Sequence, residues 1–308
     1  MMKNIYLAIW YKCNQKCLGC PCGLNDNKDM SLTLEQITSF LGKYDPEEAI
    51  CVTLSGGEPT LHPQFFEILD ELKRRNIYVA ILTNSEMFAK KDFADGFLKH
   101  ISLDRTRIIT TIHSSEKEVH ERQNGTMGSF NRTISGLKYL FLRGVNITVK
   151  HCITGVNYKN TADFIRFIDN EFHPSVDLQL FGIDYCGLSK EEAASLFVPF
   201  YEMTPWLEAG LDTYLELSEF NKRRLSIKNI PLCAVDPFYW ELLYKNNHEI
   251  GYSGYADPSH LSNGADDNSG TNSHNCELCC VREMCQGTYK SMVEYFGDDS
   301  VRPIIPME

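Results

Sequence analysis

Three cysteines close to the N-terminus have the spacing of a metal-binding site. Cys13, Cys17 and Cys20 form a C-x3-C-x2-C run directly after an apolar segment, residues 5–10. Three thiolates hold three irons of a cubane iron-sulfur cluster and leave the fourth iron open to a small molecule. A structural zinc site uses the same ligands and stays an alternative for the spacing taken alone. The sequence therefore predicts a metal centre here, and Cys22 offers a neighbouring thiol.

A glycine-containing turn follows the second predicted strand. It comprises Ser55, Gly56, Gly57, Glu58 and Pro59. Two consecutive glycines let the backbone approach a ligand closely, although an ordinary turn at the end of a strand can also contain them. The cysteine run and this turn, in this order, resemble the radical S-adenosylmethionine (SAM) superfamily. The resemblance implies that a catalytic 4Fe-4S cluster on the three cysteines chelates SAM, that the turn binds the amino group of the SAM methionine, and that reductive cleavage yields a 5'-deoxyadenosyl radical. Because the family spacing uses the other three cysteines, it also implies that Cys22 is a bystander.

Polar residues also follow the third and fourth predicted strands. In parallel α/β barrels, the groups that bind ligands lie at the carboxyl ends of the strands. We therefore expect these residues to contact SAM or a substrate, with a purely structural role at the strand ends as the alternative; they are Thr83, Asn84, His113 and Ser114. His113, His120 and His151 are not spaced as metal ligands. No catalytic acid or base is assigned.

A second group of cysteines lies near the C-terminus. Cys276, Cys279 and Cys285 have C-x2-C-x5-C spacing, and Cys233 precedes them. This tail resembles the auxiliary-cluster domains of the SPASM and twitch kind, which implies a second, closed 4Fe-4S cluster that passes electrons. A zinc site on the same four residues is the alternative. Cys280 leaves one ligand assignment open, and Cys51, Cys152 and Cys186 are expected to be small buried residues.

Apolar runs alternate with amphipathic stretches up to about residue 181, which is typical of a parallel sheet with crossover helices. The predicted strands are 5–9, 50–54, 78–82, 108–112, 147–152 and 177–181. Helices are expected after a capping box at Thr33, with Pro63 in a first turn and after a cap at Asn160, while Pro199 and Pro205 interrupt a helix over 190–216. The resemblance implies the fold: an α/β protein with a partial (β/α)6 TIM-like barrel and a small C-terminal cysteine-rich domain. Both motifs should then face one cavity.

The chain divides into three predicted parts. They are a radical SAM partial barrel at 1–187, a helical connector at 188–225, and an auxiliary-cluster domain at 226–308. Within the last part, residues 251–275 are rich in Gly, Ser, Asn and Asp, so we expect a flexible loop there.

Composition excludes several classes of protein. The 308 residues are 43% hydrophobic and carry a net charge of -11, which counts against nucleic acid as a partner. No run of 18 apolar residues and no secretory signal is present. These features predict a cytoplasmic protein in a reducing compartment, where twelve cysteines serve as metal ligands more readily than as disulfides.

The resemblance extends to radical SAM maturases of ribosomal precursor peptides. It implies hydrogen abstraction from a peptide residue, followed by a carbon-carbon or thioether crosslink or a related oxidative modification. The implied partners are a precursor peptide and an electron donor such as flavodoxin or ferredoxin. Because the chain enters its first strand at once, a separate leader-binding protein is also expected. The alternatives are a radical SAM dehydrogenase or small-molecule-modifying enzyme, and a non-catalytic iron-sulfur or zinc-binding protein.

Overall fold

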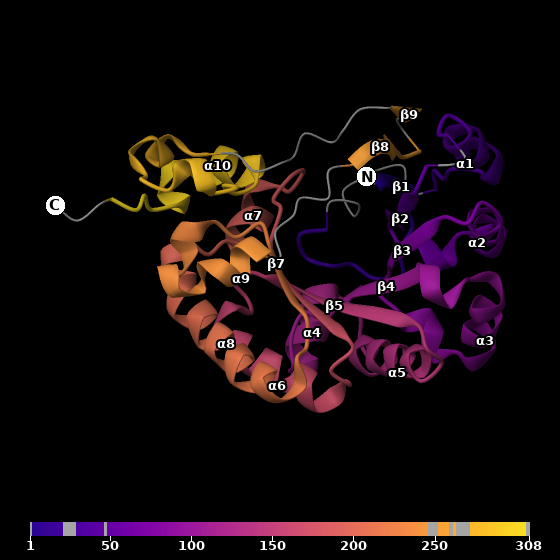
Figure 1. Ribbon diagram of the computed structural model, residues 1–308, viewed down its shortest axis with the longest axis horizontal. Coiled ribbons are helices and arrows are strands. Elements are labelled where there is room, and N and C mark those ends of the chain that lie inside the picture. Colours follow the sequence, from indigo (N-terminus) through magenta and orange to yellow (C-terminus); the bar gives the residue numbers. More distant parts are fainter. Residues whose placement is uncertain are drawn as a thin grey trace.

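The computed structural model describes residues 2–20, 29–45, 48–245, 252–258, 261–262 and 272–305. Its centre is one curved sheet with the strand order β7-β6-β5-β4-β3-β2-β1-β8-β9 (Figure 1). The strands from β7 to β8 are parallel to their neighbours, and only β9 is antiparallel. The strands are β1 (Lys3–Trp10), β2 (Ile50–Gly56), β3 (Tyr78–Leu82), β4 (Thr106–Thr111), β5 (Asn146–Ile153), β6 (Asp177–Gly182), β7 (Leu225–Lys228), β8 (Tyr252–Ala256) and β9 (Leu261–Ser262).

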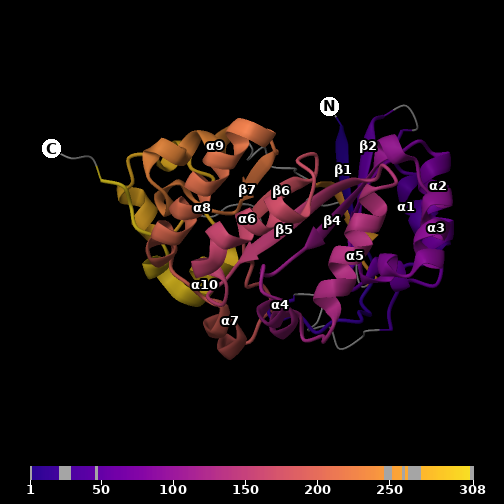
Figure 2. The same ribbon diagram turned by 90° about the horizontal axis from the view of Figure 1, so that it is seen from below.

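Helices cover the outer side of this sheet in an arc (Figure 1). Seen from below, α1 to α3 lie at the β1 end, while α8 and α9 lie at the β7 end (Figure 2). Among the described residues, no helix is long and apolar enough to cross a membrane. The helices are α1 (Leu34–Leu41), α2 (Phe65–Arg74), α3 (Lys91–His100), α4 (Lys117–Asn124), α5 (Ser129–Phe141), α6 (Thr161–Glu171), α7 (Lys190–Leu196), α8 (Phe200–Asn221), α9 (Trp240–Lys245) and α10 (Lys290–Phe296).

The two faces of the sheet differ in burial, because side chains alternate along each strand. Most residues that face the helices are apolar and buried, such as Ile108, Val149 and Leu180. The residues between them, on the concave face, are half-buried and often polar. The sheet therefore encloses a partly open, polar interior.

The six strands predicted from the sequence and the open parallel barrel are confirmed. The sheet nevertheless contains strands from beyond the predicted barrel boundary at residue 187. Most notably, β8 lies in the segment that we expected to be a loop, and it pairs with β1. The prediction of a loop over 251–275 is therefore wrong for residues 252–256 and 261–262, while residues 251, 259–260 and 263–271 lie outside the described part of the chain.

Three expectations about helix ends are corrected, whereas the capping box at Thr33 is confirmed. Asn160 occupies the N-cap of α6 but its side chain makes no capping hydrogen bond; its Nδ2 donates to Glu116 Oε1 at 3.0 Å instead. Pro63 precedes α2, whose N-cap is Gln64. Pro199 separates α7 from α8, but α8 continues through Pro205. Pro205 has no amide hydrogen, so the carbonyl four residues before it lacks its helical hydrogen bond. That carbonyl lies in the first turn of α8, at an exposed position where water can reach it.

Candidate functional site

The first cysteine group lies on the segment that follows β1, at the carboxyl edge of the sheet. Cys13 is exposed as a residue, while Cys17 and Cys20 are half-buried. Burial of its sulfur raises the pKa of the Cys13 thiol to about 11, and the neighbouring Cys20 adds to the shift. Burial likewise raises the pKa of Cys17, and Cys20 and then Cys13 add to the shift. The three thiols are therefore close enough to influence one another, and binding a cationic centre there would release protons.

The glycine turn at the end of β2 packs against this cysteine segment. A Cβ on Gly56 would lie 2.1 Å from the Trp10 carbonyl oxygen, and one on Gly57 would lie 2.3 Å from that of Lys12. The amide of Gly57 donates to Trp10 O at 2.5 Å, and that of Glu58 donates to Lys12 O at 2.8 Å. Gly56 also has a φ of +122°. The glycines thus let two backbone segments approach each other, a role that we did not predict from the sequence.

Glu58 connects the carboxyl ends of β2 and β3. Its carboxylate is 1% exposed and accepts from Thr60 N (3.0 Å), Thr60 Oγ1 (2.5 Å), Thr83 Oγ1 (2.7 Å) and Asn84 N (2.8 Å). Burial raises the pKa of Glu58, and these hydrogen bonds oppose the shift. The side-chain Nδ2 of Asn84 donates to Oδ1 of Asn14, the residue next to Cys13, at 2.7 Å. Asn84 therefore holds the cysteine segment directly, while Thr83 and the Asn84 backbone hold Glu58, whose own amide donates to Lys12 O.

A second carboxylate, Glu86, supports the same segment and was not identified from the sequence. Gln15 donates to Glu86 Oε1 at 2.7 Å, and Arg132 on α5 donates to Oε2 at 2.5 Å. Gln15 also accepts from the Cys17 thiol at 3.4 Å. Glu86 is 6% exposed. The ion pair of Glu86 with Arg132 therefore fixes a residue that lies between two of the candidate ligands.

The end of α4 completes the support of the cysteine segment. The amides of Lys16 and Leu18 donate to the carbonyls of Asn124 (2.9 Å) and Gln123 (2.8 Å). The segment is therefore held at three places: by the ends of β2 and β3, by Glu86, and by the last residues of α4.

The predicted residues after β4 lie in a buried, neutral cluster of histidines. The His113 amide donates to His120 Nδ1 at 3.1 Å, and His151 Nδ1 donates to Ile112 O at 3.0 Å. Burial lowers the pKa of His113 to about 3 and those of His120 and His151 to about 4. His113 Nδ1, His120 Nε2 and His151 Nε2 have no hydrogen-bond partner within the described part of the chain. Ser114 is 1% exposed, and its hydroxyl accepts from the Glu116 amide, which is a turn contact.

The second cysteine group converges on one pocket in the C-terminal segment. Cys233, Cys276, Cys279 and Cys285 all line it, whereas Cys280 is exposed and does not. Burial raises the pKa of Cys233 to about 12, and Cys285 is the next contributor.

Backbone amides point at the sulfurs of this pocket. Cys285 Sγ accepts from Leu232 N and Gly287 N, and Cys279 Sγ accepts from Ile304 N, each at 3.4 Å. Amide hydrogen bonds to cysteine sulfurs are one of the features that tune iron-sulfur centres. The four thiols and their donors therefore fit a closed thiolate-ligated centre.

The thiolate ligands of both cysteine groups suit an iron-sulfur cluster. Within the described residues, no three His, Cys, Asp or Glu side chains converge as the ligands of a single ion do. A cubane takes one thiolate on each iron and so accepts thiolates set farther apart. Cys51 and Cys152 are half-buried, while Cys186 is exposed, which corrects the expectation of a buried residue. Cys22 lies outside the described residues.

Comparisons with known proteins bear on this site. The model of the family described as the radical SAM superfamily matches residues 7–170. A probable GTP 3',8-cyclase of Sulfolobus acidocaldarius is 26% identical over 245 residues, which are 77% of this chain and 74% of that protein. The subtilosin biosynthesis protein AlbA of Bacillus subtilis is 27% identical over 141 residues (45% and 30%), and the mycofactocin maturase MftC of Mycobacterium tuberculosis is 23% identical over 230 residues (65% and 55%). The chain thus spans less than two thirds of these two maturation proteins.

Solved structures share the fold. Streptococcus suis SuiB bound to the precursor peptide SuiA aligns with 99% of this chain and 75% of its own, with a TM-score of 0.61 and 13% identity. Native anSMEcpe with bound AdoMet and Cp18Cys peptide aligns with 98% of this chain and 92% of its own, with a TM-score of 0.68 and 16% identity.

Proposed function

Because the chain belongs to the radical SAM superfamily, we propose that it cleaves SAM at a 4Fe-4S cluster held by Cys13, Cys17 and Cys20 and abstracts hydrogen from a ribosomal precursor peptide. The observation that carries this proposal is the cysteine segment, held by Glu58, Glu86 and the end of α4 at the carboxyl edge of the sheet. When bound, the cluster and SAM supply one-electron cleavage to methionine and a 5'-deoxyadenosyl radical. A carbon-carbon or thioether crosslink, or a related oxidative change, then follows on the peptide.

The residues of this chain position SAM and keep the cysteine segment in place. The proposed SAM site combines the turn after β2 with the residues after β3 and β4. The backbone of the turn offers donors and acceptors to the amino acid part of SAM, while Glu58 holds the turn. The site residues are Ser55, Gly56, Gly57, Glu58, Pro59, Thr83, Asn84, His113 and Ser114.

We propose a second 4Fe-4S cluster in the C-terminal pocket, on Cys233, Cys276, Cys279 and Cys285. Four protein thiolates leave no open iron, so this cluster would accept the surplus electron of an oxidative reaction and would not bind substrate. The convergence of these four residues on one pocket, without Cys280, supports the assignment. A zinc ion on the same residues is the competing assignment.

Two observations favour a peptide as substrate. AlbA is named as a bacteriocin biosynthesis protein and MftC as a maturase, and SuiB, whose structure is solved with the precursor peptide SuiA, shares the fold. An electron donor such as flavodoxin or ferredoxin and a separate leader-binding protein complete this proposal, in the cytoplasm. A small-molecule substrate is the second candidate, because the similarity to the GTP 3',8-cyclase covers 77% of the chain. A dehydrogenase would use the same two centres.

The decisive experiment combines metal analysis with SAM cleavage. After anaerobic reconstitution, we expect about eight irons per chain in the wild type and about four in the Cys13→Ala/Cys17→Ala/Cys20→Ala variant, which should form no 5'-deoxyadenosine. Cys279→Ala should lower the iron content, whereas the neighbouring Cys280→Ala should retain it. Zinc in place of iron and no SAM cleavage would refute the proposal. Incubation with precursor peptides or with GTP then separates the two substrate classes.

A further inference from the structure

The outer side of α8 carries negative charge only. The 22 residues of this helix include five carboxylates and no lysine, arginine or histidine; the carboxylates belong to Glu202, Glu208, Asp212, Glu216 and Glu219. Glu208 is half-buried and the other four are exposed. At 3.6 residues per turn, they lie on one side of the helix, opposite buried residues such as Leu207 and Leu211. We call this exposed side of residues 201–220 the α8 face.

The carboxylates of the α8 face lack the ion pairs that neutralise charge elsewhere on the surface. Glu171 on α6, for example, pairs with Lys138 on α5 at 2.6 Å. None of the five α8 carboxylates forms a salt bridge with a residue in the described part of the chain. A neighbouring phenol is affected by this charge: its hydrogen bond to Asp212 raises the pKa of Tyr239 to about 12, and burial and the charges of Asp212 and Glu208 add to the shift. The negative charge of the α8 face is therefore uncompensated.

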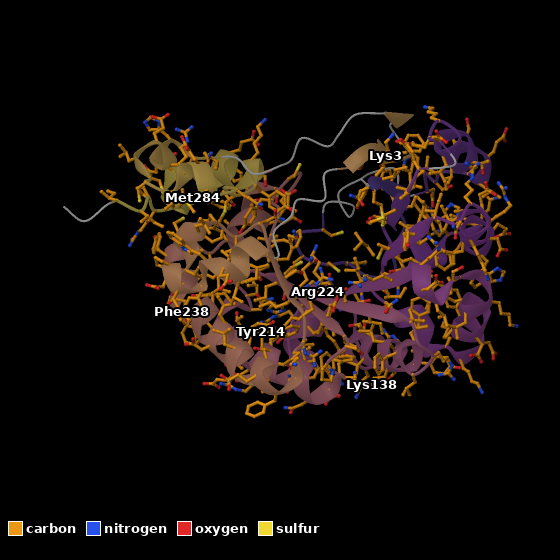
Figure 3. All side chains as sticks on the ribbon, viewed as in Figure 1. Lys3, Lys138, Tyr214, Arg224, Phe238 and Met284 are labelled. Atoms are coloured by element: carbon orange, nitrogen blue, oxygen red, sulfur yellow. The ribbon has the colours of Figure 1, made fainter. Side chains whose placement is uncertain are left out.

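Exposed aromatic rings lie among these carboxylates. On α8, Trp206 is 41% exposed and Phe220 is 87% exposed. Phe238, which is 72% exposed, belongs to the turn before α9, and the amide of Asp236 in this turn donates to Glu208 Oε1 at 2.6 Å. Figure 3 shows Phe238 at the outer surface of the molecule, beside α8. Exposed apolar groups gathered on one face are typical of a surface that binds another molecule.

Two further features of the α8 face suit the side chains of lysine and arginine. The guanidinium carbon of Arg302, which comes from the C-terminal segment, lies 3.8 Å from the centroid of the exposed Tyr201 ring. An aromatic ring of this face therefore already holds a cation. The carbonyl of Tyr201 lacks its helical hydrogen bond because Pro205 has no amide hydrogen, so an exposed acceptor lies beside Glu202. Ammonium and guanidinium groups donate to carboxylates and carbonyls and stack on aromatic rings.

We propose that the α8 face binds a basic segment of the precursor peptide, in which lysine or arginine alternates with apolar residues. This inference rests on the proposed function and names where the peptide docks, which is on the outer layer of helices at the β7 end of the sheet (Figure 1). A helix of 22 residues is about 33 Å long, a length that an extended segment of about ten residues spans. The basic side chains pair with the carboxylates, and the apolar ones cover the exposed rings.

The test measures fluorescence anisotropy of labelled peptides with the reconstituted protein. The probes are peptides of about ten residues in which leucine alternates with lysine or with glutamate, at an ionic strength of about 0.15 M, where attraction by distant charges is screened. We expect the lysine peptide to bind and the glutamate peptide not to bind. Glu202→Gln/Glu216→Gln should weaken binding of the lysine peptide about tenfold, equal to about 1.4 kcal/mol. Trp206→Ser should also weaken it, because an exposed ring is lost.

Matched controls change the same groups elsewhere on the surface. Glu35→Gln/Glu67→Gln removes two exposed carboxylates from the first turns of α1 and α2, at the opposite end of the sheet (Figure 2). Leu142→Ser removes a side chain that is 79% exposed, at the end of α5. Both variants should bind the lysine peptide like the wild type. If the two double variants weaken binding equally, only net charge attracts the peptide and the α8 face is not its site.

Two other results would overturn the proposal. Unchanged binding in Glu202→Gln/Glu216→Gln and in Trp206→Ser would refute it directly. If sedimentation shows a wild-type dimer that Trp206→Ser dissociates, a second copy of the chain covers the α8 face and the peptide assignment is wrong. SAM cleavage in the same preparation separates this inference from the proposed function. A wild type that binds the lysine peptide but cleaves no SAM supports the docking face while the proposed function fails, and the reverse result refutes the docking face alone.

Discussion

Replacing Gly57 by alanine tests whether close backbone packing positions the cysteine segment. The new Cβ would lie 2.3 Å from Lys12 O and 2.5 Å from Tyr11 O, whereas real Cβ atoms stay at least 3.0 Å from such neighbours. The opposing atoms belong to the backbone and cannot rotate away. The cysteine segment or the turn must therefore shift by at least 0.7 Å, the difference between the 3.0 Å limit and the 2.3 Å contact.

Such a shift breaks or stretches two hydrogen bonds, from Gly57 N to Trp10 O and from Glu58 N to Lys12 O. At about 1 kcal/mol each, their loss lowers the free energy of unfolding by about 2 kcal/mol. Misplacement of reacting groups by about 1 Å can lower a rate about 100-fold, and we expect a loss of this order in 5'-deoxyadenosine formation. Iron content, the initial rate and denaturant unfolding measure the three effects.

Gly96→Ala is the control. Gly96 lies inside α3, and the nearest atom to its new Cβ is on the Phe66 ring at 3.7 Å, an ordinary contact. This variant should be more stable by about 0.5–1 kcal/mol and should cleave SAM like the wild type. If Gly57→Ala keeps its rate within about threefold and its stability within about 0.5 kcal/mol, the packing argument is refuted.

Three further predictions concern buried ionisable groups. Glu86→Gln leaves Arg132 without its counter-charge and weakens the hold on Gln15, so the free energy of unfolding should fall by about 1–3 kcal/mol and the retained iron should decrease, as measured by denaturation and metal analysis. The three buried histidines have pKa values of about 3 or 4, below the ordinary value of 6.5. Because the unfolded chain binds more protons between these values, stability should fall as the pH drops from about 6.5 to about 4, by up to about 3 kcal/mol per histidine, and the pH slope should be shallower in His151→Asn. Arg223 is 4% exposed and donates to four backbone carbonyls, so Arg223→Met should cost about 3–5 kcal/mol in urea unfolding.

The sequence predicted the strands and the cysteine groups because these signals are local. Each predicted strand is a short segment in which apolar and β-branched residues are frequent, and the two cysteine groups are recognisable from their spacing. Glu86 was missed because its partners, Gln15 and Arg132, lie 71 and 46 residues away along the chain. No local pattern marks such a contact.

The strand β8 was missed for a related reason. Its sequence contains Gly254, which reads as a loop residue. A Cβ at Gly254 would lie 1.9 Å from the hydroxyl of Tyr44, so this glycine is required by packing against another part of the chain. The Tyr255 ring stacks on that of Tyr6 at 5.4 Å. The segment forms a strand because it pairs with β1, and this long-range pairing is not evident from its amino-acid composition.

The pairing of β1 with β8 also sets an order of events during synthesis. Asn4 pairs with Tyr252, so the two partners are about 250 residues apart. At about 5–20 residues per second, the ribosome needs roughly 10 to 50 seconds to make the second partner after the first. During that time β1, which leads directly into Cys13, is the edge strand of a growing sheet. We therefore expect β1 to stay an open edge until β8 is made, whereas the hydrogen bonds that hold the first cysteine segment, with partners within residues 57–132, can form much earlier in translation.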